Sequence, residues 1–271
     1  MIFIIAHFFR QVKQLYKPKR TGFYENTINN FVFAAYNNGV EEITITQNGF
    51  SSLYMSYLYA KVKERFSFLP AEFDFHREGE LAQIECKTER AYCPYVRRYA
   101  EENIADVIAI GYKYAFFEKR LTLPLLSKEK KRLLFTALVA ADYREDKTYI
   151  MRRFYGADEY CLDGVFHFRL RELKKRWEEI ADYVPPEMSE AALDGFLGFL
   201  VEDGDGKVFI KDGKVYDENY RPLCKSKLTG EESVVGEVLL GGAERVYCFG
   251  DTDKATEKFL KKYYAEKATF C

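Results

Sequence analysis

The chain has 271 residues, of which 48% are hydrophobic and 31% charged, and this balance excludes an intrinsically disordered protein. Aromatic residues make up 17% and are almost all Phe and Tyr, which typically fill cores and interfaces. The net charge of −1 excludes a global electrostatic attraction to nucleic acid or anionic lipid. Six scattered cysteines without a Cys-x-x-Cys pair favour reduced thiols over disulfides or a zinc site.

Residues 1–90 are predicted to form a small α/β unit. The apolar run Ile2–Phe9 is expected to be a buried strand, because it is too short to span a bilayer and lacks the basic start and cleavage site of a signal peptide. The other elements predicted here are a helix at Asn26–Asn37, a strand at Glu42–Thr46, a helix at Ser51–Phe66, and a hairpin of Ala71–Phe75 with Leu81–Cys86.

Residues 91–202 are predicted to form a helical bundle. The expected helices are Pro94–Ala115, one capped by Ser127, Arg144–Tyr155, Asp163–Val184, and one beginning at Ser189. The clearest of them is expected to start at Asp163 as its cap. Its apolar positions are spaced by four and three residues in alternation, which predicts a seam against a partner helix. They are Phe166, Leu170, Leu173, Trp177, Ile180 and Val184.

Residues 203–271 are predicted to form a hairpin followed by a β-α-β unit. The hairpin Lys207–Tyr216 is expected to turn at Asp212-Gly213, a strong hairpin signal. A capping box at Thr229 should start the next helix. A buried strand at Val246–Phe249, a helix at Lys254–Tyr264 and a strand at Ala268–Cys271 follow, and the two strands should pair in parallel. The chain is therefore predicted to be α+β, with an N-terminal α/β unit, a central helical bundle and a C-terminal unit with a short mixed sheet.

No catalytic site is assembled in the sequence, and no Gly-rich phosphate loop is present. Of the three histidines, His167 is expected to be partly buried and hydrogen-bonded, and His7 to lie in the core. Asp251 and Asp253 lie between a strand and a helix, where they could hold Mg²⁺. The simpler interpretation is a turn and a helix cap. We therefore expect no cofactor, no metal and no enzymatic activity, with a metal-dependent enzyme at Asp251/Asp253 as an alternative.

Charge is unevenly distributed along the middle of the chain. Residues 113–176 contain 16 Lys and Arg against nine Asp and Glu, and residues 177–205 contain nine Asp and Glu without a single Lys or Arg. The two blocks could be surfaces for two partners, or could neutralise each other within the fold. Nine basic residues form a candidate interaction surface, and if they share one face they could bind phosphates, which gives nucleic-acid binding as an alternative function. They are Lys128, Lys130, Lys131, Arg132, Arg152, Arg153, Arg171, Lys174 and Lys175.

The segment Leu162–Leu170, with the sequence LDGVFHFRL, resembles the LDGF-x-x-FRL run that opens a long charged helix in the YtxC-like sporulation proteins. Val165 replaces the usual aromatic residue. The resemblance covers roughly residues 90–271 and is weakest over Val201–Leu223. It implies association with endospore formation, a cytoplasmic location and no assigned activity, and it supplies no catalytic residues. We therefore expect a cytoplasmic interaction or scaffold protein with a protein partner and no insertion into the membrane.

Overall fold

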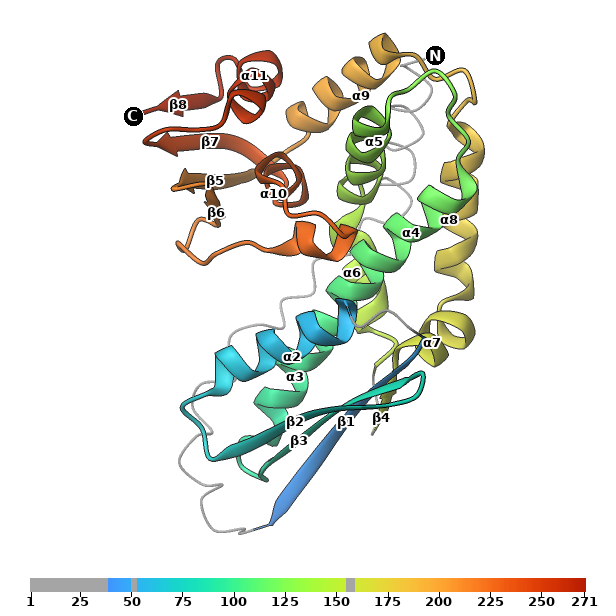
Figure 1. Ribbon diagram of the computed structural model, residues 1–271, viewed down its shortest axis with the longest axis vertical. Helices are drawn as coiled ribbons and strands as arrows, with labels where there is room; N and C mark the ends of the chain where they lie inside the picture. Colours follow the sequence, from blue (N-terminus) through green and yellow to red (C-terminus); the bar gives the residue numbers. More distant parts are fainter. Residues whose placement is uncertain (1–38, 50–52, 155–158) are drawn as a thin grey trace. The chain divides into compact units, whose positions relative to one another are not determined.

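The computed structural model describes residues 39–49, 53–154 and 159–271 (Figure 1). The strand expected at Ile2–Phe9 and the helix expected at Asn26–Asn37 lie outside these residues, and so does His7. Within the described ranges, helices and two small four-stranded mixed sheets make up an α+β fold, as predicted. No helix in these ranges combines the length and the apolarity needed to cross a membrane.

The described residues divide into two compact units, each with its own sheet. The N-terminal unit contains residues 39–108 and 147–173, and the C-terminal unit contains residues 109–146 and 174–271. The predicted helical segment 91–202 therefore contributes to both units. The boundaries predicted after residues 90 and 202 stay a prediction.

Sheet A, in the N-terminal unit, has its strands in the order β2-β3-β1-β4. They are β1 (Val40–Asn48), β2 (Ala71–Glu78), β3 (Leu81–Glu89) and β4 (Glu159–Cys161). β3 pairs antiparallel with β1 and β2, and the short β4 pairs parallel with β1. The predicted strand and hairpin are confirmed with longer strands, and the hairpin turns at Gly79, whose φ of 59° suits glycine.

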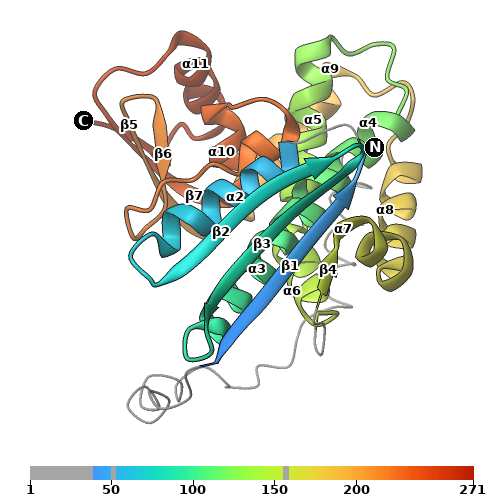
Figure 2. The same ribbon diagram turned by 60° about the horizontal axis from the view of Figure 1, so that its bottom comes forward.

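Helices α2 (Leu53–Phe66) and α3 (Cys93–Asp106) pack against one face of sheet A (Figure 2). Ile45 in β1 and Ile84 in β3 are paired across the strands and are buried on this face. The alternate positions are polar, and the Glu85 carboxylate lies 3.5 Å from the Lys87 ammonium there. Sheet A therefore has the ordinary pattern of one apolar, covered face and one polar, solvated face.

The predicted helix at Pro94–Ala115 is confirmed, but it contains a π-helical segment. After α3 the chain continues as η1 (Val107–Tyr112) and then as α4 (Lys113–Arg120). π-Helical segments are rare and often occur at functional sites, and the residue that follows this one is Lys113.

The long helix predicted to start at Asp163 is interrupted. It consists of α7 (Leu162–Gly164), the π-helical turn η2 (Val165–Arg169) and α8 (Arg171–Tyr183), and Leu170 leaves the helical conformation with φ −114° and ψ 30°. Asp163 is not its cap, because its carboxylate accepts a hydrogen bond of 2.8 Å from the backbone N–H of Asn48 at the end of β1. Phe166 is only half-buried. The rest of the predicted apolar seam, from Leu170 to Val184, is buried.

The other helices are α5 (Lys128–Ala140), α6 (Tyr143–Met151) and α9 (Glu190–Glu202). The predicted cap Ser127 is confirmed, and Ser189, predicted as the start of a helix, is a cap as well, because both hydroxyls accept hydrogen bonds from backbone N–H groups three residues later. In the C-terminal unit, α5 packs against α4, α9 and α10 (Val234–Leu240).

Sheet B, in the C-terminal unit, has its strands in the order β6-β5-β7-β8. They are β5 (Gly206–Lys211), β6 (Lys214–Tyr216), β7 (Ala243–Phe249) and β8 (Ala268–Phe270). The hairpin turn at Asp212 and Gly213 is confirmed, with φ values of 51° and 70°. The parallel pairing of β7 with β8 is also confirmed, and β5 pairs parallel with β7.

The cap predicted for α10 is wrong. Thr229 ends a short 3₁₀ helix, η3 (Lys225–Thr229), and the hydroxyl of Ser233 instead accepts a hydrogen bond of 3.2 Å from the N–H of Gly236. The last helix, α11 (Lys254–Tyr263), connects β7 to β8.

Candidate functional site

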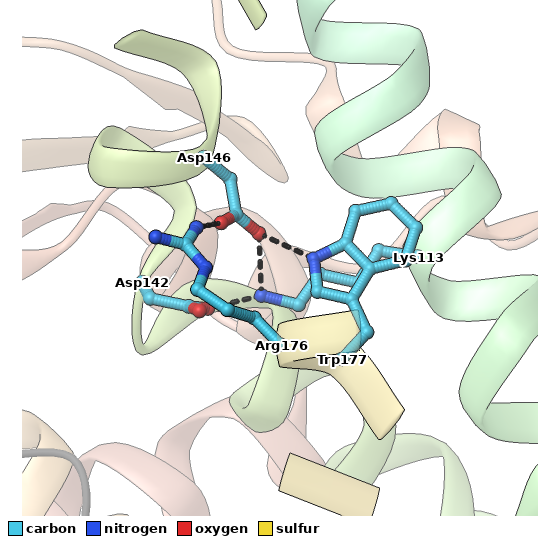
Figure 3. A network of polar contacts seen from close by, with 5 residues as sticks. All are labelled: Lys113, Asp142, Asp146, Arg176 and Trp177. Carbon is cyan, nitrogen blue, oxygen red and sulfur yellow. Dashed lines mark hydrogen bonds and ion pairs between the residues drawn. The ribbon is translucent and has the colours of Figure 1, made fainter. Parts of the chain in front are cut away.

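Five side chains in the C-terminal unit form a buried charged network (Figure 3). Lys113 is fully buried and donates to the carboxylates of Asp142 and Asp146, with 2.8 Å between its Nζ and Oδ2 of Asp146. Arg176 donates to the other oxygen of Asp146, and Nε1 of Trp177 donates to Oδ2 of Asp146 at 2.9 Å. Two cations therefore neutralise two carboxylates around Asp146.

The protonation of this network favours a structural role. Burial by itself lowers the pKa of Lys113, but the carboxylates of Asp142 and Asp146 outweigh it, so the pKa is raised. Lys113 is then an ammonium at neutral pH and is not available as a nucleophile or general base. The network also lies apart from the two cavities described next, because none of its residues lines them.

Two small cavities lie in the C-terminal unit. The first, of about 170 Å³, is lined by the ion pair of Arg144 and Asp205, 2.5 Å apart between Nη1 and Oδ2. The second, of about 270 Å³, is lined by Glu237, whose carboxylate already accepts hydrogen bonds of 2.7 Å from both the N–H and the hydroxyl of Ser226. Both are smaller than the roughly 300–1,000 Å³ of typical ligand pockets. The pair of Arg144 and Asp205 and the carboxylate of Glu237 are thus already engaged within the protein, so neither cavity is a strong candidate for an active site.

Of the two carboxylates that could have held a metal ion, Asp253 caps helix α11 instead. Asp253 accepts hydrogen bonds from the backbone N–H groups of Ala255 and Thr256 and from the Thr256 hydroxyl. Asp251 is exposed. In the part of the chain that the structure describes, His, Cys, Asp and Glu side chains form no group of three suited to a metal ion. The capping interpretation of Asp253 is confirmed.

The two described histidines belong to the N-terminal unit. His76 is on β2 in the N-terminal unit, with its Nε2 3.9 Å from a carboxylate oxygen of Glu85. His167 is exposed and its ring lies 5.2 Å from that of Phe166, so the expectation of a partly buried, hydrogen-bonded side chain is wrong.

The candidate interaction surface predicted from the basic residues is divided between the units. Lys128, Lys130, Lys131, Arg132, Lys174 and Lys175 belong to the C-terminal unit, and Arg152, Arg153 and Arg171 to the N-terminal unit. Several of these residues already have partners. Lys130 lies 3.8 Å from Glu190, Arg132 lies 2.5 Å from Glu231, and the guanidinium of Arg153 lies 4.8 Å from the ring centre of Tyr149.

The basic and acidic blocks of the sequence do meet within the C-terminal unit. Arg120 pairs with Asp182 at 3.2 Å, and Arg144 pairs with Asp205. Together with the pair of Lys130 and Glu190, these contacts favour the interpretation that the two blocks partly neutralise each other.

Sheet B carries aromatic side chains on the face opposite its helices. Val208 and Ile210 of β5 and Val246 and Cys248 of β7 are buried, whereas the alternate side chains are half-buried or exposed. We call this second side the open face of sheet B. Its strand positions are Lys207, Phe209, Lys211, Lys214, Tyr216, Arg245, Tyr247, Phe249 and Thr269.

The rings on the open face of sheet B lie nearly parallel to one another. The ring centre of Phe209 lies 5.5 Å from that of Tyr247 and 6.3 Å from that of Phe249, with interplanar angles of 24° and 25°. Tyr220, from the loop after β6, stacks on Phe209 at 4.5 Å and 13° and is 65% exposed. Exposed apolar surfaces with polar borders typically mark interaction sites.

Comparison with protein-family models, curated proteins and solved structures finds no match to the chain.

The open face of sheet B was missed because β7 was predicted to be simply buried. Two matching segments contain the signal: KVFIK at Lys207–Lys211 and RVYCF at Arg245–Phe249. In each segment, successive side chains point to opposite faces of the sheet. Val and the residue two positions after it therefore lie on the buried face, and the cation and the aromatic residue lie on the other face. The charged network gave no such signal, because its residues come from three separate helical regions of the chain.

Proposed function

We propose that this chain is a non-enzymatic binding protein that acts in the cytoplasm of a spore-forming bacterium during sporulation. We further propose that the open face of sheet B is its recognition surface. The assignment to sporulation is supported by the resemblance of Leu162–Leu170 to the YtxC-like proteins. The binding role is supported by one structural observation: Phe209, Tyr220, Tyr247 and Phe249 form a group of nearly parallel rings on a strand face that carries no buried apolar layer.

The contrast between the two sheets supports this choice of surface. On sheet A the positions facing away from the helices carry side chains such as Glu85 and Lys87, as expected for a face in water. On sheet B the equivalent positions of β5 and β7 carry Phe209, Tyr247 and Phe249. Large rings on a solvated face contribute little to the core of their own unit, and aromatic residues are enriched in binding surfaces.

The proposal can be tested in sporulating cells with a ring variant, Phe209→Ala/Tyr220→Ala. A matched control, Phe68→Ala/Phe168→Ala, removes two aromatic side chains of the N-terminal unit that are each 74% exposed. We expect chemical cross-linking to join the wild-type chain and the control variant to the same partner, and the ring variant to lose it. We also expect the ring variant alone to lower spore yield.

Two results would contradict the proposal. One is a ring variant that keeps every cross-link of the wild-type chain and sporulates normally. The other is a purified chain that turns over a metabolite, since this would show a catalytic activity.

A further inference from the structure

The open face of sheet B carries cations between its rings. Strand pairing places Lys207 beside Arg245 and Lys211 beside both Lys214 and Phe249. All four cationic side chains are exposed. The paired strand positions of this face contain no Asp or Glu (Glu244 is the unpaired bulge residue of β7), although the chain as a whole has slightly more acidic than basic residues. The open face is therefore locally basic.

Tyr220 is held over the face by its loop. The carboxylate of Asp217 accepts hydrogen bonds of 2.9 Å from the backbone N–H groups of Asn219 and Arg221, and the N–H of Tyr220 donates to the Asp217 carbonyl at 3.0 Å. This turn gives Tyr220 a φ of 56°, which is uncommon for a residue with a bulky side chain. The ring is thereby fixed in a stack with Phe209 while one side of the stack stays accessible.

Rings and cations in this arrangement fit a flexible polyanion with flat bases. Proteins that bind single strands combine aromatic side chains, on which bases stack, with a basic surface that follows the phosphates. A duplex hides the faces of its bases, so these rings would not reach them. A protein partner fits less well, because lysine is depleted in protein–protein interfaces whereas Lys207 and Lys211 flank Phe209 on its own strand.

We infer that the open face of sheet B binds single-stranded nucleic acid, with bases stacked on its accessible rings, above all on Tyr220, which itself stacks on Phe209. The phosphates then lie near Lys207, Lys211, Lys214 and Arg245. The inference rests on the proposed function, which makes this face the recognition surface, and it adds the chemical class of the ligand. It places nucleic acid on sheet B and not on the basic residues of the helices.

The inference predicts how the affinity for a single strand changes when the Tyr220 ring is removed and when the salt concentration is raised. The probe is a fluorescein-labelled oligo(dT) or oligo(U) of about 12 nucleotides, and binding is followed by fluorescence anisotropy. Tyr220→Ala should weaken binding about 5- to 150-fold, as expected for the loss of one base stack. Four phosphate contacts to a single strand should give a slope of about −3 for log K against log salt, and Lys207→Gln/Arg245→Gln should reduce it by about half.

Three controls locate the binding surface. Phe68→Ala/Phe168→Ala removes exposed rings elsewhere, Lys130→Ala/Lys131→Ala/Arg132→Ala removes cations of the basic helical block, and a hairpin duplex of the same length replaces the single strand. Each control variant should bind the single strand as the wild-type chain does, and the duplex should bind at least about tenfold more weakly. Unchanged fluorescence of Trp177 shows that the variants of the C-terminal unit are folded, unchanged circular dichroism shows it for Phe68→Ala/Phe168→Ala, and Tyr220→Ala affects a side chain that is 65% exposed.

The inference would be overturned if Tyr220→Ala and Phe209→Ala left binding intact while the Lys130/Lys131/Arg132 variant lost it. The binding surface would then be the basic residues of helix α5. Absence of binding at about 50 mM salt, or equal affinity for the duplex, would overturn the inference as well. If the ring variant nevertheless loses a cross-linked protein in cells, the proposed function stands with a protein as the ligand. If the ring variant keeps both its oligonucleotide binding and its cross-linked partner, both proposals fail.

Discussion

Replacement of Lys113 by Met removes the cation at the centre of the buried network while keeping a side chain of similar length. In the variant Lys113→Met, Asp142 loses its ion pair, whereas Asp146 keeps its bonds from Arg176 and Trp177. Removal of one partner from a buried ion pair costs about 3–5 kcal/mol of unfolding free energy, because the other charge stays buried without compensation. The unfolding free energy of a protein typically falls by about 2 kcal/mol per molar urea, so the midpoint of urea unfolding should fall by about 1.5–2.5 M.

The double variant Lys113→Met/Asp142→Leu separates loss of the ion pair from loss of packing. It removes one charge of each sign and leaves the pair of Asp146 and Arg176 intact. Because exchange of a complete buried pair for apolar groups is often neutral, the double variant should recover to within about 1 kcal/mol of the wild-type chain. Lys119→Met, at an exposed position of the same helix, should change the unfolding free energy by less than about 0.5 kcal/mol.

The pH dependence of the single variant gives a second readout. Burial and the neighbouring Asp146 raise the pKa of Asp142 to about 7 even with Lys113 present. A carboxyl group with a raised pKa holds its proton more tightly in the folded than in the unfolded state, so stability falls as the pH rises from about 4 through 7. Lys113→Met should extend this fall to higher pH, because the pKa of Asp142 rises further without the neighbouring ammonium, and the double variant should lack it.

Urea titrations followed by the fluorescence of Trp177 measure these effects within the C-terminal unit, because Trp177 is the only tryptophan of the chain and donates to Asp146. A midpoint for Lys113→Met within about 0.5 M of the wild-type value would refute the assignment of the network as a stabilising element. So would a double variant that is no more stable than the single one.

Two further predictions concern single side chains. Asp253→Ala should lower the unfolding free energy by about 1 kcal/mol, whereas Asp251→Ala should not. Because hydrogen bonds from Thr256 lower the pKa of Asp253, this difference in stability should fade as the pH falls below about 4. Urea titrations at several pH values would detect the change. Burial raises the pKa of Cys86 to about 12. In the native chain, iodoacetamide at pH 8 should therefore alkylate the exposed Cys271 at least about 100-fold faster than Cys86, as measured by mass spectrometry. Equal rates would contradict the buried placement of Cys86.

Local chemistry explains which elements of the fold were predictable from sequence. Ser127 and Asp212-Gly213 determine a cap and a turn through their own hydrogen bonds or backbone preferences, and the structure has both where the sequence indicates. A contact with a distant partner can override such a local signal. Asp163 reads as a helix cap in isolation, but the N–H of Asn48, 115 residues earlier, binds its carboxylate.

For the candidate sites, too, local sequence signals were readable, whereas contacts between distant residues were not. The charge blocks were visible in the sequence, but the ion pairs between them depend on tertiary contacts such as that of Arg120 with Asp182. The network of Lys113 could not be predicted, because no periodicity indicates that a lysine in a helix is fully buried. The open face of sheet B was encoded by period-two alternation, but two strands had to be aligned to show that Phe209 and Tyr247 lie side by side.

Tyr220 allows a direct comparison of stability with binding. A left-handed backbone conformation costs a residue other than glycine roughly 1–2 kcal/mol, and Tyr220 adopts it with a φ of 56°. A sequence selected only for stability would favour Gly or Asn at this position. Tyr220→Gly relieves the backbone strain and loses a stack with Phe209 worth about 0.5–1.5 kcal/mol, so the two changes should roughly cancel in the unfolding free energy.

The same substitution should abolish one base stack in the binding assay. A Tyr220→Gly variant of near wild-type stability that binds oligo(dT) weakly would show that the ring is kept for recognition, at a position where the fold itself would favour glycine. If instead the urea midpoint followed by Trp177 falls by more than about 1 M while binding is unchanged, Tyr220 is a structural residue, and the argument from the open face loses its most exposed member.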